Sequence, residues 1–300
     1  EGRKYIGIGT GDSYSTYIMQ NMFYQRMKRA MEGESTYWLS KPLRVGIGQK
    51  HSLGVEMGAK DLKAFITFAY NDIQGAMKGS KRDIITGDMN LSYRAGGWVF
   101  RNIMSISAMN GSESPWGTFD EYAKQNPYFT PYDESGNIKK FLFNGSIDGY
   151  SEPLVVNPMW NATIGTSETS QYLDFTDNFY VEYNPFQSLK LVARFGIDTK
   201  KTQYDTFLPA EHTKFVYNIS SQDDYISRGS YELTTGNYVD YSADASAQFN
   251  RTFADRHYVF ATAQYNISET HYDEVSNIAY GFPNEFMKTL AQARAYMTGT

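Results

Sequence analysis

The chain has 300 residues, a net charge of -5 and a sequence pI near 5.5. This length suits one large β domain or two ordinary ones, and the acidic balance, with no basic stripe, excludes nucleic acid as the partner. Cysteine is absent, which excludes disulfides, thiol nucleophiles and thiolate metal sites.

Catalytic and metal sites find no support in the sequence. No GxSxG, HExxH or Ser/His/Asp arrangement occurs, and adjacent carboxylates such as Asp120 and Glu121 do not fix the separation that glycosidase chemistry needs. The scattered histidines show no metal-ligand spacing: His51, His212, His257 and His271. We therefore expect a protein that is not an enzyme and has no catalytic residues, no metal and no cofactor.

Aromatic residues make up 16% of a chain whose mean hydropathy is -0.52. Polar chains this rich in aromatic residues include carbohydrate-binding modules and outer-membrane barrels. No apolar run approaches the ~18 residues that a membrane-spanning helix requires. A membrane barrel needs strands of only ~9–11 alternating residues, so that class stays open.

The first predicted element is an amphipathic helix over residues 14–32. Gly33 follows it as a C-terminal stop, and apolar residues recur within it at helical spacing: Met19, Met22, Phe23, Met27, Ala30 and Met31. We interpret the methionine stripe as ordinary packing rather than a ligand face. The preceding GIGTGDS lacks the spacing of a phosphate-binding loop and is expected to form a turn.

From residue 45 onward the hydrophobic period is two, which predicts about eight long strands and an all-β, antiparallel fold. The clearest alternation is VDYSADASAQFN at 239–250, where every odd position is apolar or aromatic and every even position is polar. The strands are expected near residues 51–58, 63–71, 84–93, 98–109, 173–183, 189–198, 239–250 and 259–268.

Short and long links alternate between these strands. Tight turns are expected at 59–62, 94–97, 185–188 and 252–256, and longer links at 74–82, near 110–170, near 200–237 and from 270 onward. All short turns then lie at one end of the sheet, where aromatic residues also cluster. Outer-membrane barrels have this asymmetry, whereas Greek-key sandwiches mix link lengths at both ends.

The two faces of the predicted strands differ in charge. On strand 189–198, Lys190 and Arg194 would each cost up to roughly 2–4 kcal/mol near mid-bilayer, so their face must look into water. The opposite face, nearly free of charge, suits lipid and a protein core equally well. Alternation alone therefore leaves two alternatives, a transmembrane barrel and a soluble secreted carbohydrate-binding β-sandwich.

The longest link carries the candidate ligand-binding residues. Residues 113–160 are rich in proline and aromatic side chains. Four of these aromatic residues are candidates for stacking on a sugar or peptide: Trp116, Tyr128, Tyr132 and Trp160. The alternative is that they pack the link against itself, as a loop of this length requires.

Eight strings along the chain, taken together and in this order, resemble the SusC/RagA family of TonB-linked outer-membrane transporters. They are TYWLSKPLR (36–44), HSLGVEMG (51–58), YNDIQGAMKGSKRD (70–83), NLSYR (90–94), NPYFTPYDESGNIKK (126–140), NPMWNAT (157–163), DNFYVEYNPFQSLKLVARFGID (177–198) and GFPNEF (281–286). Single strings are weak signals, but the set covers nearly the whole chain.

The resemblance implies a barrel of about 22 strands, filled by an N-terminal plug, in the outer membrane of a Gram-negative cell. It further implies import of oligosaccharides or peptides without covalent chemistry, beneath a SusD-like surface lipoprotein and with energy relayed through TonB. The chain shows no TonB box, no plug sequence and no barrel-closing strands. It therefore looks like an internal segment, and TonB is expected to act on a region absent from it.

The resemblance also divides the chain. Residues 1–41 are expected to form a plug-to-barrel connector that includes the helix, and residues 42–300 a transmembrane antiparallel β-barrel segment with extracellular loops. GFPNEFMKTLAQARAY (281–296) is expected to be a helical element of one loop. The odd face of VDYSADASAQFN is expected to meet outer-membrane lipid. Polar residues are expected to face the lumen and contact the plug: Glu56, Asp88, Arg194, Asp240 and Asp244.

Overall fold

The computed structural model describes residues 20, 23–24, 27–143, 146–147, 150–151, 155–216, 221–282 and 288–297. Within the predicted helix over 14–32, residues 20, 23–24 and 27–31 are helical. Residues 14–19, 21–22 and 25–26, and with them Met19 and Met22, lie outside the described residues.

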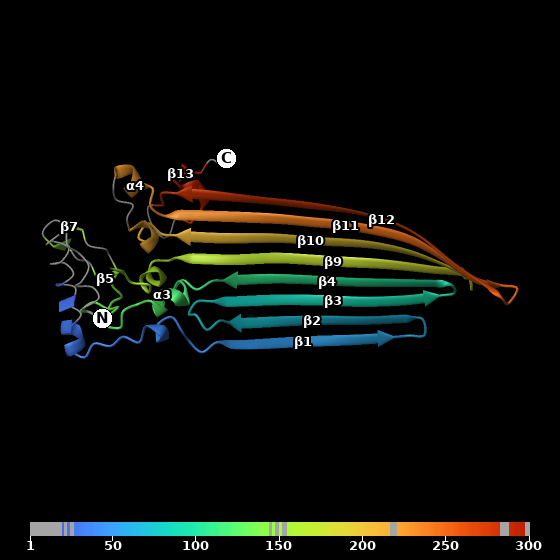
Figure 1. The fold of residues 1–300 in the computed structure, drawn as a ribbon, viewed down its shortest axis with the longest axis horizontal. Coiled ribbons are helices and arrows are strands. Elements are labelled where there is room, and N and C mark those ends of the chain that lie inside the picture. The colour runs from blue at the N-terminus through green and yellow to red at the C-terminus, as the bar shows by residue number, and fades with distance from the viewer. Residues whose placement is uncertain are drawn as a thin grey trace.

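One antiparallel sheet makes up most of the described chain (Figure 1). Its nine strands follow the order β1-β2-β3-β4-β9-β10-β11-β12-β13, so neighbours in the sheet follow one another along the chain apart from the excursion between β4 and β9. The strands are β1 (Ile47–Gly58), β2 (Leu62–Gln74), β3 (Lys81–Ala95), β4 (Trp98–Ser112), β9 (Ser167–Phe186), β10 (Leu189–Leu208), β11 (Ser230–Phe253), β12 (His257–Tyr280) and β13 (Ala295–Tyr296). The all-β prediction is confirmed, with eight long strands and a two-residue ninth.

Four short turns, at residues 59–61, 96–97, 187–188 and 254–256, lie at one end of the sheet and the longer links at the other (Figure 1). This asymmetry agrees with the sequence-based prediction. In the β11–β12 turn, Ala254 and Asp255 both have left-handed backbones, with φ of 52° and 55°. Two successive left-handed residues are the geometry of a type I′ hairpin turn, which matches the twist of the strands it joins.

Strands β9 to β12 are longer than the sequence pattern predicts. β11 and β12 have 24 residues each, which at roughly 3.3 Å per residue spans about 80 Å. The links predicted near 110–170, near 200–237 and from 270 were therefore too long; the structure has them at 113–166, 209–229 and from 281. The hydrophobic alternation ends near Thr199, but residues 200–207 continue to pair with both neighbouring strands. Hydrogen bonds between strand backbones form whatever the side chains are, so a strand can continue where both of its faces are polar.

Beyond the strand ends, residues 34–46 and the described residues of 113–166 and 209–229 fold together into what we call the loop cluster. Its short elements are η1 (Trp38–Ser40), α3 (Phe119–Ala123), β5 (Phe141–Phe143), β6 (Ser146–Ile147), β7 (Tyr150–Ser151), β8 (Val155–Val156), η2 (Trp160–Thr163), η3 (Thr213–Phe215) and α4 (Gln222–Ile226). Strands β5 and β8 form one two-stranded sheet, and β6 and β7 another. In the described part of the chain, no helix is long and apolar enough to cross a membrane.

A small hydrophobic core holds the loop cluster together. Its members come from η1, α3 and the β4–β9 link, and are Trp38, Tyr122, Phe129, Leu142 and Met159. Trp38 Nε1 donates to the carbonyl of Asn126 at 2.8 Å. The fully buried Asn157 amide donates to the carbonyls of Pro131 and Lys139 at 2.9 and 2.8 Å. The chain before β1 is thereby fastened to the longest link.

The helix expected over residues 281–296 is wrong in its described part. That part contains a single 3-10 turn, η4 (Leu290–Gln292), followed by β13. Leu290 and Ala293 pack against a cluster of Phe207, Ala279 and Phe282, and the backbone of β13 pairs with the end of β12. The free edge of β12 thus draws this segment into the sheet. Residues 283–287 lie outside the described residues.

Candidate functional site: two faces of the sheet and a loop cluster

The strand register assigns each residue of the long strands to one of two faces. Cross-strand partners share a face, so a row can be followed across the sheet. One such row runs from Val55 through Ile66, Met89 and Met104. We call the side of this row the apolar face and the opposite side the polar face.

The apolar face carries a continuous band next to the short turns. On β12 the band covers odd positions from 259 to 267, and Glu269, His271 and Asp273 follow it. On β10 it runs from 189 to 197, before Thr199 and Lys201. About ten residues tilted by ~40° span roughly 25 Å, the height of the lipid-facing band of an outer-membrane barrel.

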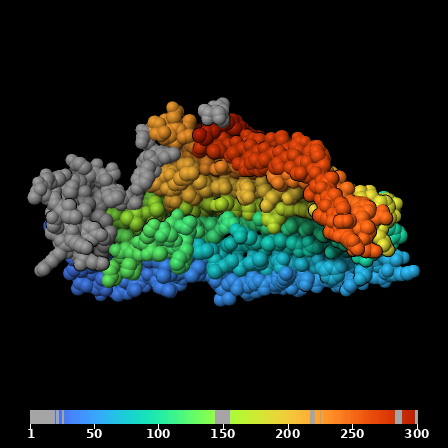
Figure 2. Space-filling view, turned by 45° about the vertical axis from the view of Figure 1, so that its right-hand side comes forward, coloured from blue at the N-terminus to red at the C-terminus, as the bar shows by residue number. Residues whose placement is uncertain are grey.

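No other layer of the described chain covers this band. Leu53, Phe195 and Ile267 on the apolar face are 66%, 49% and 58% exposed. The space-filling view shows one side of the molecule, where the strands lie side by side as bands coloured from blue to red in chain order (Figure 2). A β-sandwich requires a second sheet over the apolar face, and the further described strands lie in the loop cluster. The β-sandwich architecture is therefore not the one the described residues form.

Aromatic rings line the apolar face at the short-turn end. Trp98 stacks on Tyr183, with ring centroids 4.1 Å apart, and on Phe100 at 5.8 Å. Tyr93 continues the row, 6.3 Å from Phe100. Rings with a polar tip at the edge of an apolar band are typical of a membrane–water interface.

One polar pair interrupts the apolar band. The side-chain amide of Asn102 donates to Asp177 Oδ1 at 2.5 Å, between β4 and β9. Because the amide partner satisfies the carboxylate locally, the pair can sit on an otherwise apolar surface.

The five predicted lumen-facing residues all lie on the polar face: Glu56, Asp88, Arg194, Asp240 and Asp244. Asp88 accepts hydrogen bonds from Ser105 at 2.8 Å and Thr67 at 3.0 Å. Arg194 lies 3.9 Å from Asp244 across β10 and β11. A face held by hydroxyl–carboxylate contacts suits water or another polar surface; contact with a plug stays a prediction.

The four loop aromatic residues divide into two kinds. Trp116 packs against the core of the loop cluster, under Lys78 Nζ at 4.6 Å, and Trp160 Nε1 donates to the carbonyl of Glu211 at 3.0 Å. Both tryptophans therefore have partners within the chain. Tyr128 and Tyr132 are 41% and 37% exposed, and Lys41 Nζ lies 5.3 Å from the Tyr132 ring. Within the described residues, no ring–ring contact joins two of these four side chains.

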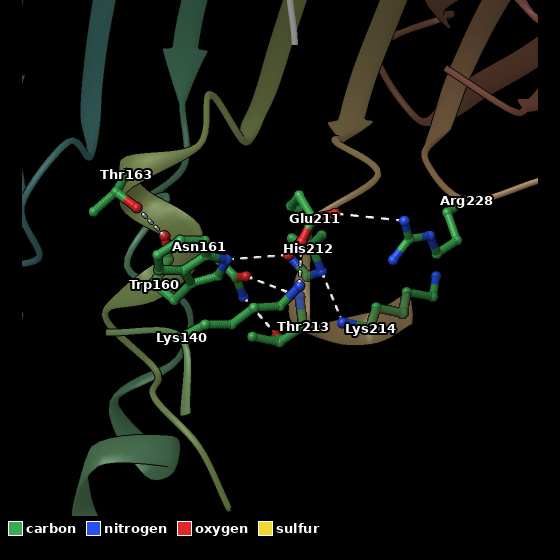
Figure 3. A network of polar contacts seen from close by, with 9 residues as sticks. All are labelled: Lys140, Trp160, Asn161, Thr163, Glu211, His212, Thr213, Lys214 and Arg228. Atoms are coloured by element: carbon green, nitrogen blue, oxygen red, sulfur yellow. Dashed lines mark hydrogen bonds and ion pairs between the residues drawn. The ribbon is translucent and has the colours of Figure 1, made fainter. Parts of the chain in front are cut away.

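A polar network joins the β4–β9 link to the β10–β11 link (Figure 3). Glu211 accepts from Lys140 Nζ at 2.6 Å and lies 3.4 Å from Arg228. Asn161 donates to Thr213 Oγ1 at 2.8 Å and accepts from the Thr213 backbone at 3.1 Å. These contacts fix the two links side by side. Sequence reasoning missed Glu211 and Asn161; for Asn161 the one available signal was its place in NPMWNAT.

Burial and charge shift two titrating groups in this network. The hydrogen bond from Lys140 is the main reason that the pKa of Glu211 lies below its ordinary value. Burial lowers the pKa of His212 to about 4, so its ring is neutral at physiological pH. The neutral Nδ1 accepts from the backbone N–H of Lys214 at 3.0 Å and caps η3. Among the described residues, no cluster of His, Asp and Glu is suited to hold a metal.

No family model matches the chain, and no curated protein does. Among solved structures, it is similar to a chain of the RagAB peptide importer in the "closed-closed" state, with a TM-score of 0.66, 16% identity, and coverage of 87% of this chain and 28% of that one. For the "open-open" state the TM-score is 0.67, at 16% identity and the same coverage. For the RagAB peptide transporter it is 0.65, at 15% identity, covering 88% and 29%.

The chain spans less than a third of the length of these importer chains. At this level of identity the likeness concerns the fold. The sheet of β1 to β12 and its loop cluster thus have the fold of a part of those transporter chains.

Proposed function

We propose that this chain forms part of the barrel wall and the external loops of a TonB-dependent outer-membrane importer of the SusC/RagA family. The observation that carries the proposal is an uncovered antiparallel sheet with one apolar and one polar face and all short turns at one end. The similarity to the RagAB structures, at TM-scores of 0.65 to 0.67, supports the same fold.

In this proposal the apolar band meets outer-membrane lipid and the polar face looks into the lumen. Glu56, Asp88, Arg194, Asp240 and Asp244 then face whatever fills the interior. The outer edges of β1 and β12 pair with further strands, because an unpaired backbone edge is too costly in lipid. The short turns point to the periplasm and the loop cluster to the outside.

The placement of residues 34–46 bears on the predicted connector. Of the predicted connector, Trp38 packs in the core of the loop cluster, at the end of the sheet opposite the short turns. In the proposed orientation this part of residues 1–41 lies on the external side, and its role as a plug-to-barrel connector stays a prediction.

The proposed substrate is an oligosaccharide or peptide, recognised by the external loops together with a SusD-like lipoprotein. TonB acts through a region outside this chain. Of the four loop aromatic residues, Tyr128 and Tyr132 are the candidates for direct stacking, because they are exposed and the two tryptophans have partners within the chain.

The test uses the intact protein in its own cell. We expect it in the outer-membrane fraction, with uptake of labelled peptide or oligosaccharide that stops when the proton gradient is collapsed. The double change Tyr128→Ala and Tyr132→Ala should lower uptake at low substrate concentration several-fold. Tyr37→Ala, which removes another exposed ring of the loop cluster, is the matched control. Recovery of the protein in a soluble fraction would support the carbohydrate-binding alternative instead.

A further inference from the structure

A groove of about 700 Å³ crosses strands β4, β9, β10, β11 and β12 on the same side of the sheet as the apolar band. The register shows that two neighbouring rows, each with one residue from every one of these strands, make up most of its lining. The row nearer the band is Ala108, Leu173, Lys201, Asn237 and Asp273, and the next is Asn110, Gln171, Gln203, Thr235 and Val275. The volume lies within the range of about 300–1,000 Å³ that is typical of ligand sites.

The groove begins where the apolar band ends. On β10 the band stops at Ile197, and Thr199 and Lys201 follow it on the same face. Leu173, in the row nearer the band, is 46% exposed and continues the apolar surface up to the groove. In the proposed orientation a molecule in the groove therefore lies outside the barrel wall, at the level of the headgroups of the outer leaflet. A substrate that crosses the lumen does not pass this side.

The polar side chains of the groove have unused hydrogen-bonding capacity. Within the described residues, the side-chain amides of Asn110, Gln171 and Asn237 make no hydrogen bond to another protein group. Gln203 donates to Asp205 Oδ2 at 2.8 Å and keeps its carbonyl oxygen as an acceptor. An amide offers both donors and an acceptor, which is what a sugar hydroxyl, itself a donor and an acceptor, requires.

The groove also holds a lysine without a counter-charge. Among the described residues Lys201 has no ion-pair partner, whereas Lys200, its neighbour on the polar face, lies 3.9 Å from Asp174. Asp273, at the other end of the same row, contacts His271 at 2.7 Å. Two strand spacings, roughly 10 Å, separate the backbones of Lys201 and Asp273. A lysine among amides suits a ligand with many hydroxyl groups and one anionic group.

We propose that this groove binds the saccharide headgroup of an outer-leaflet glycolipid. The sugar hydroxyls contact the amides of Asn110, Gln171 and Asn237, and an anionic substituent such as a phosphate contacts Lys201. The acyl chains lie on the apolar band and hold the headgroup at this height, so weak contacts in an open groove are sufficient. The inference rests on the proposed function in one respect, that the apolar band meets the outer membrane with the loop cluster outside.

The test measures lipid binding to the intact protein by native mass spectrometry in a mild detergent. The lipid probes are a glucosamine-disaccharide lipid with one phosphate, the same lipid without phosphate, and phosphatidylglycerol. The phosphorylated disaccharide without acyl chains is added as a competitor. The variants are Lys201→Gln and the pair Gln171→Ala with Asn237→Ala. Lys200→Gln, which removes the same charge one residue away on the polar face, is the matched control.

The phosphorylated glycolipid should bind more tightly than phosphatidylglycerol, because only its headgroup reaches the amides. Lys201→Gln should weaken its binding about two- to five-fold, the effect of one exposed ion pair, and should leave the lipid without phosphate unaffected. The amide pair should weaken both glycolipids, and Lys200→Gln neither. Equal binding of phosphatidylglycerol, or groove variants that bind like Lys200→Gln, would overturn the proposal. Displacement by an equal concentration of the soluble disaccharide would overturn the choice of a lipid.

Outer-membrane recovery and uptake are measured on the same protein. If these succeed while the protein does not select the glycolipid, the groove proposal fails and the importer proposal stands. If the protein is recovered in a soluble fraction, the importer proposal fails whatever lipid it binds in detergent.

Discussion

A charge has opposite consequences at neighbouring positions of one strand in this protein. Ala245 lies on the apolar face between Ala193 and Tyr265, whereas Ser246 lies on the polar face beside Gln264. Ala245→Arg should cost roughly 2–4 kcal/mol if the apolar band meets lipid. Ser246→Arg places the same side chain toward water.

We therefore expect Ala245→Arg to impair barrel assembly in a heat-modifiability gel assay of the intact protein, and Ser246→Arg to assemble much like the unchanged protein. Equal assembly of the two variants would show that the assignment of the faces is wrong.

The Asn102–Asp177 pair gives a second test at the residue scale. Asn102→Leu removes the donor and leaves Asp177 without its partner on an apolar surface, which should cost about 1–3 kcal/mol. Replacing both residues by leucine removes the unsatisfied group as well and should restore most of that stability. Urea unfolding of the intact protein in lipid measures the free energy of unfolding of the unchanged protein and of each variant. A double variant as unstable as Asn102→Leu would contradict the argument.

Contacts between residues on distant strands could not be predicted from the sequence. The alternation in VDYSADASAQFN was sufficient to divide its residues between two faces. It could not reveal Asp177 as a partner of Asn102, because the two residues meet only through the pairing of β4 with β9 across the longest link.

At the scale of elements, the contact between the two long links should depend on pH. The pKa of His212 is lowered to about 4 by burial, against an ordinary value near 6.5. The unfolded link therefore binds a proton first as pH falls, and the folded link loses stability between about pH 6.5 and 4. Partial exposure of the ring limits this loss to the order of 2 kcal/mol. Glu211, whose pKa is also lowered, loses its contribution only at still lower pH.

His212→Asn keeps an acceptor for the Lys214 N–H and cannot titrate, so it should flatten the pH dependence in this window. The measurement is the hydrogen-exchange protection of residues 209–216, corrected for intrinsic rates. His271→Asn, on the exposed surface of β12, is the control and should change nothing there. If hydrogen-exchange protection in His212→Asn changed with pH as it does in the unchanged protein, a group other than His212 would be responsible.

Element lengths were predicted well where one face was apolar and poorly elsewhere. The first four strands end within a few residues of their predicted limits because polar turns bound them closely. Strands β9 to β12 continue past their apolar bands, through threonine, tyrosine and glutamine, where only backbone pairing defines a strand. The segment after β12 reads as a helix but joins the sheet edge, because the free edge and the Phe207 cluster offer partners that local sequence does not show.

At the scale of the whole molecule, the sheet has an open edge. β1 pairs only with β2 among the described strands, and its outer edge presents unpaired backbone groups. The 300-residue chain expressed by itself should therefore aggregate in dilute detergent. Lysine at two positions of this edge strand, Ser52→Lys with Gly54→Lys, should slow aggregation several-fold by light scattering.

The control adds the same charge inside the sheet, as Thr176→Lys with Asn178→Lys on β9. These residues face the polar side and have a strand on each flank, so they should slow aggregation less. Equal effects of the two pairs would mean that net charge, rather than the edge, controls aggregation.

The sequence by itself determined the all-β class, the two faces and the gathering of short turns at one end, because alternation and turn residues are local properties of a strand and its ends. It also grouped Glu56, Asp88, Arg194, Asp240 and Asp244 on polar positions. Only the tertiary structure showed that no layer of the described chain covers the apolar face, how far the strands run, and which residues from distant links meet. Those outcomes depend on strand pairing and on packing between segments far apart in the chain, such as Glu211 with Lys140 and Trp38 with Asn126.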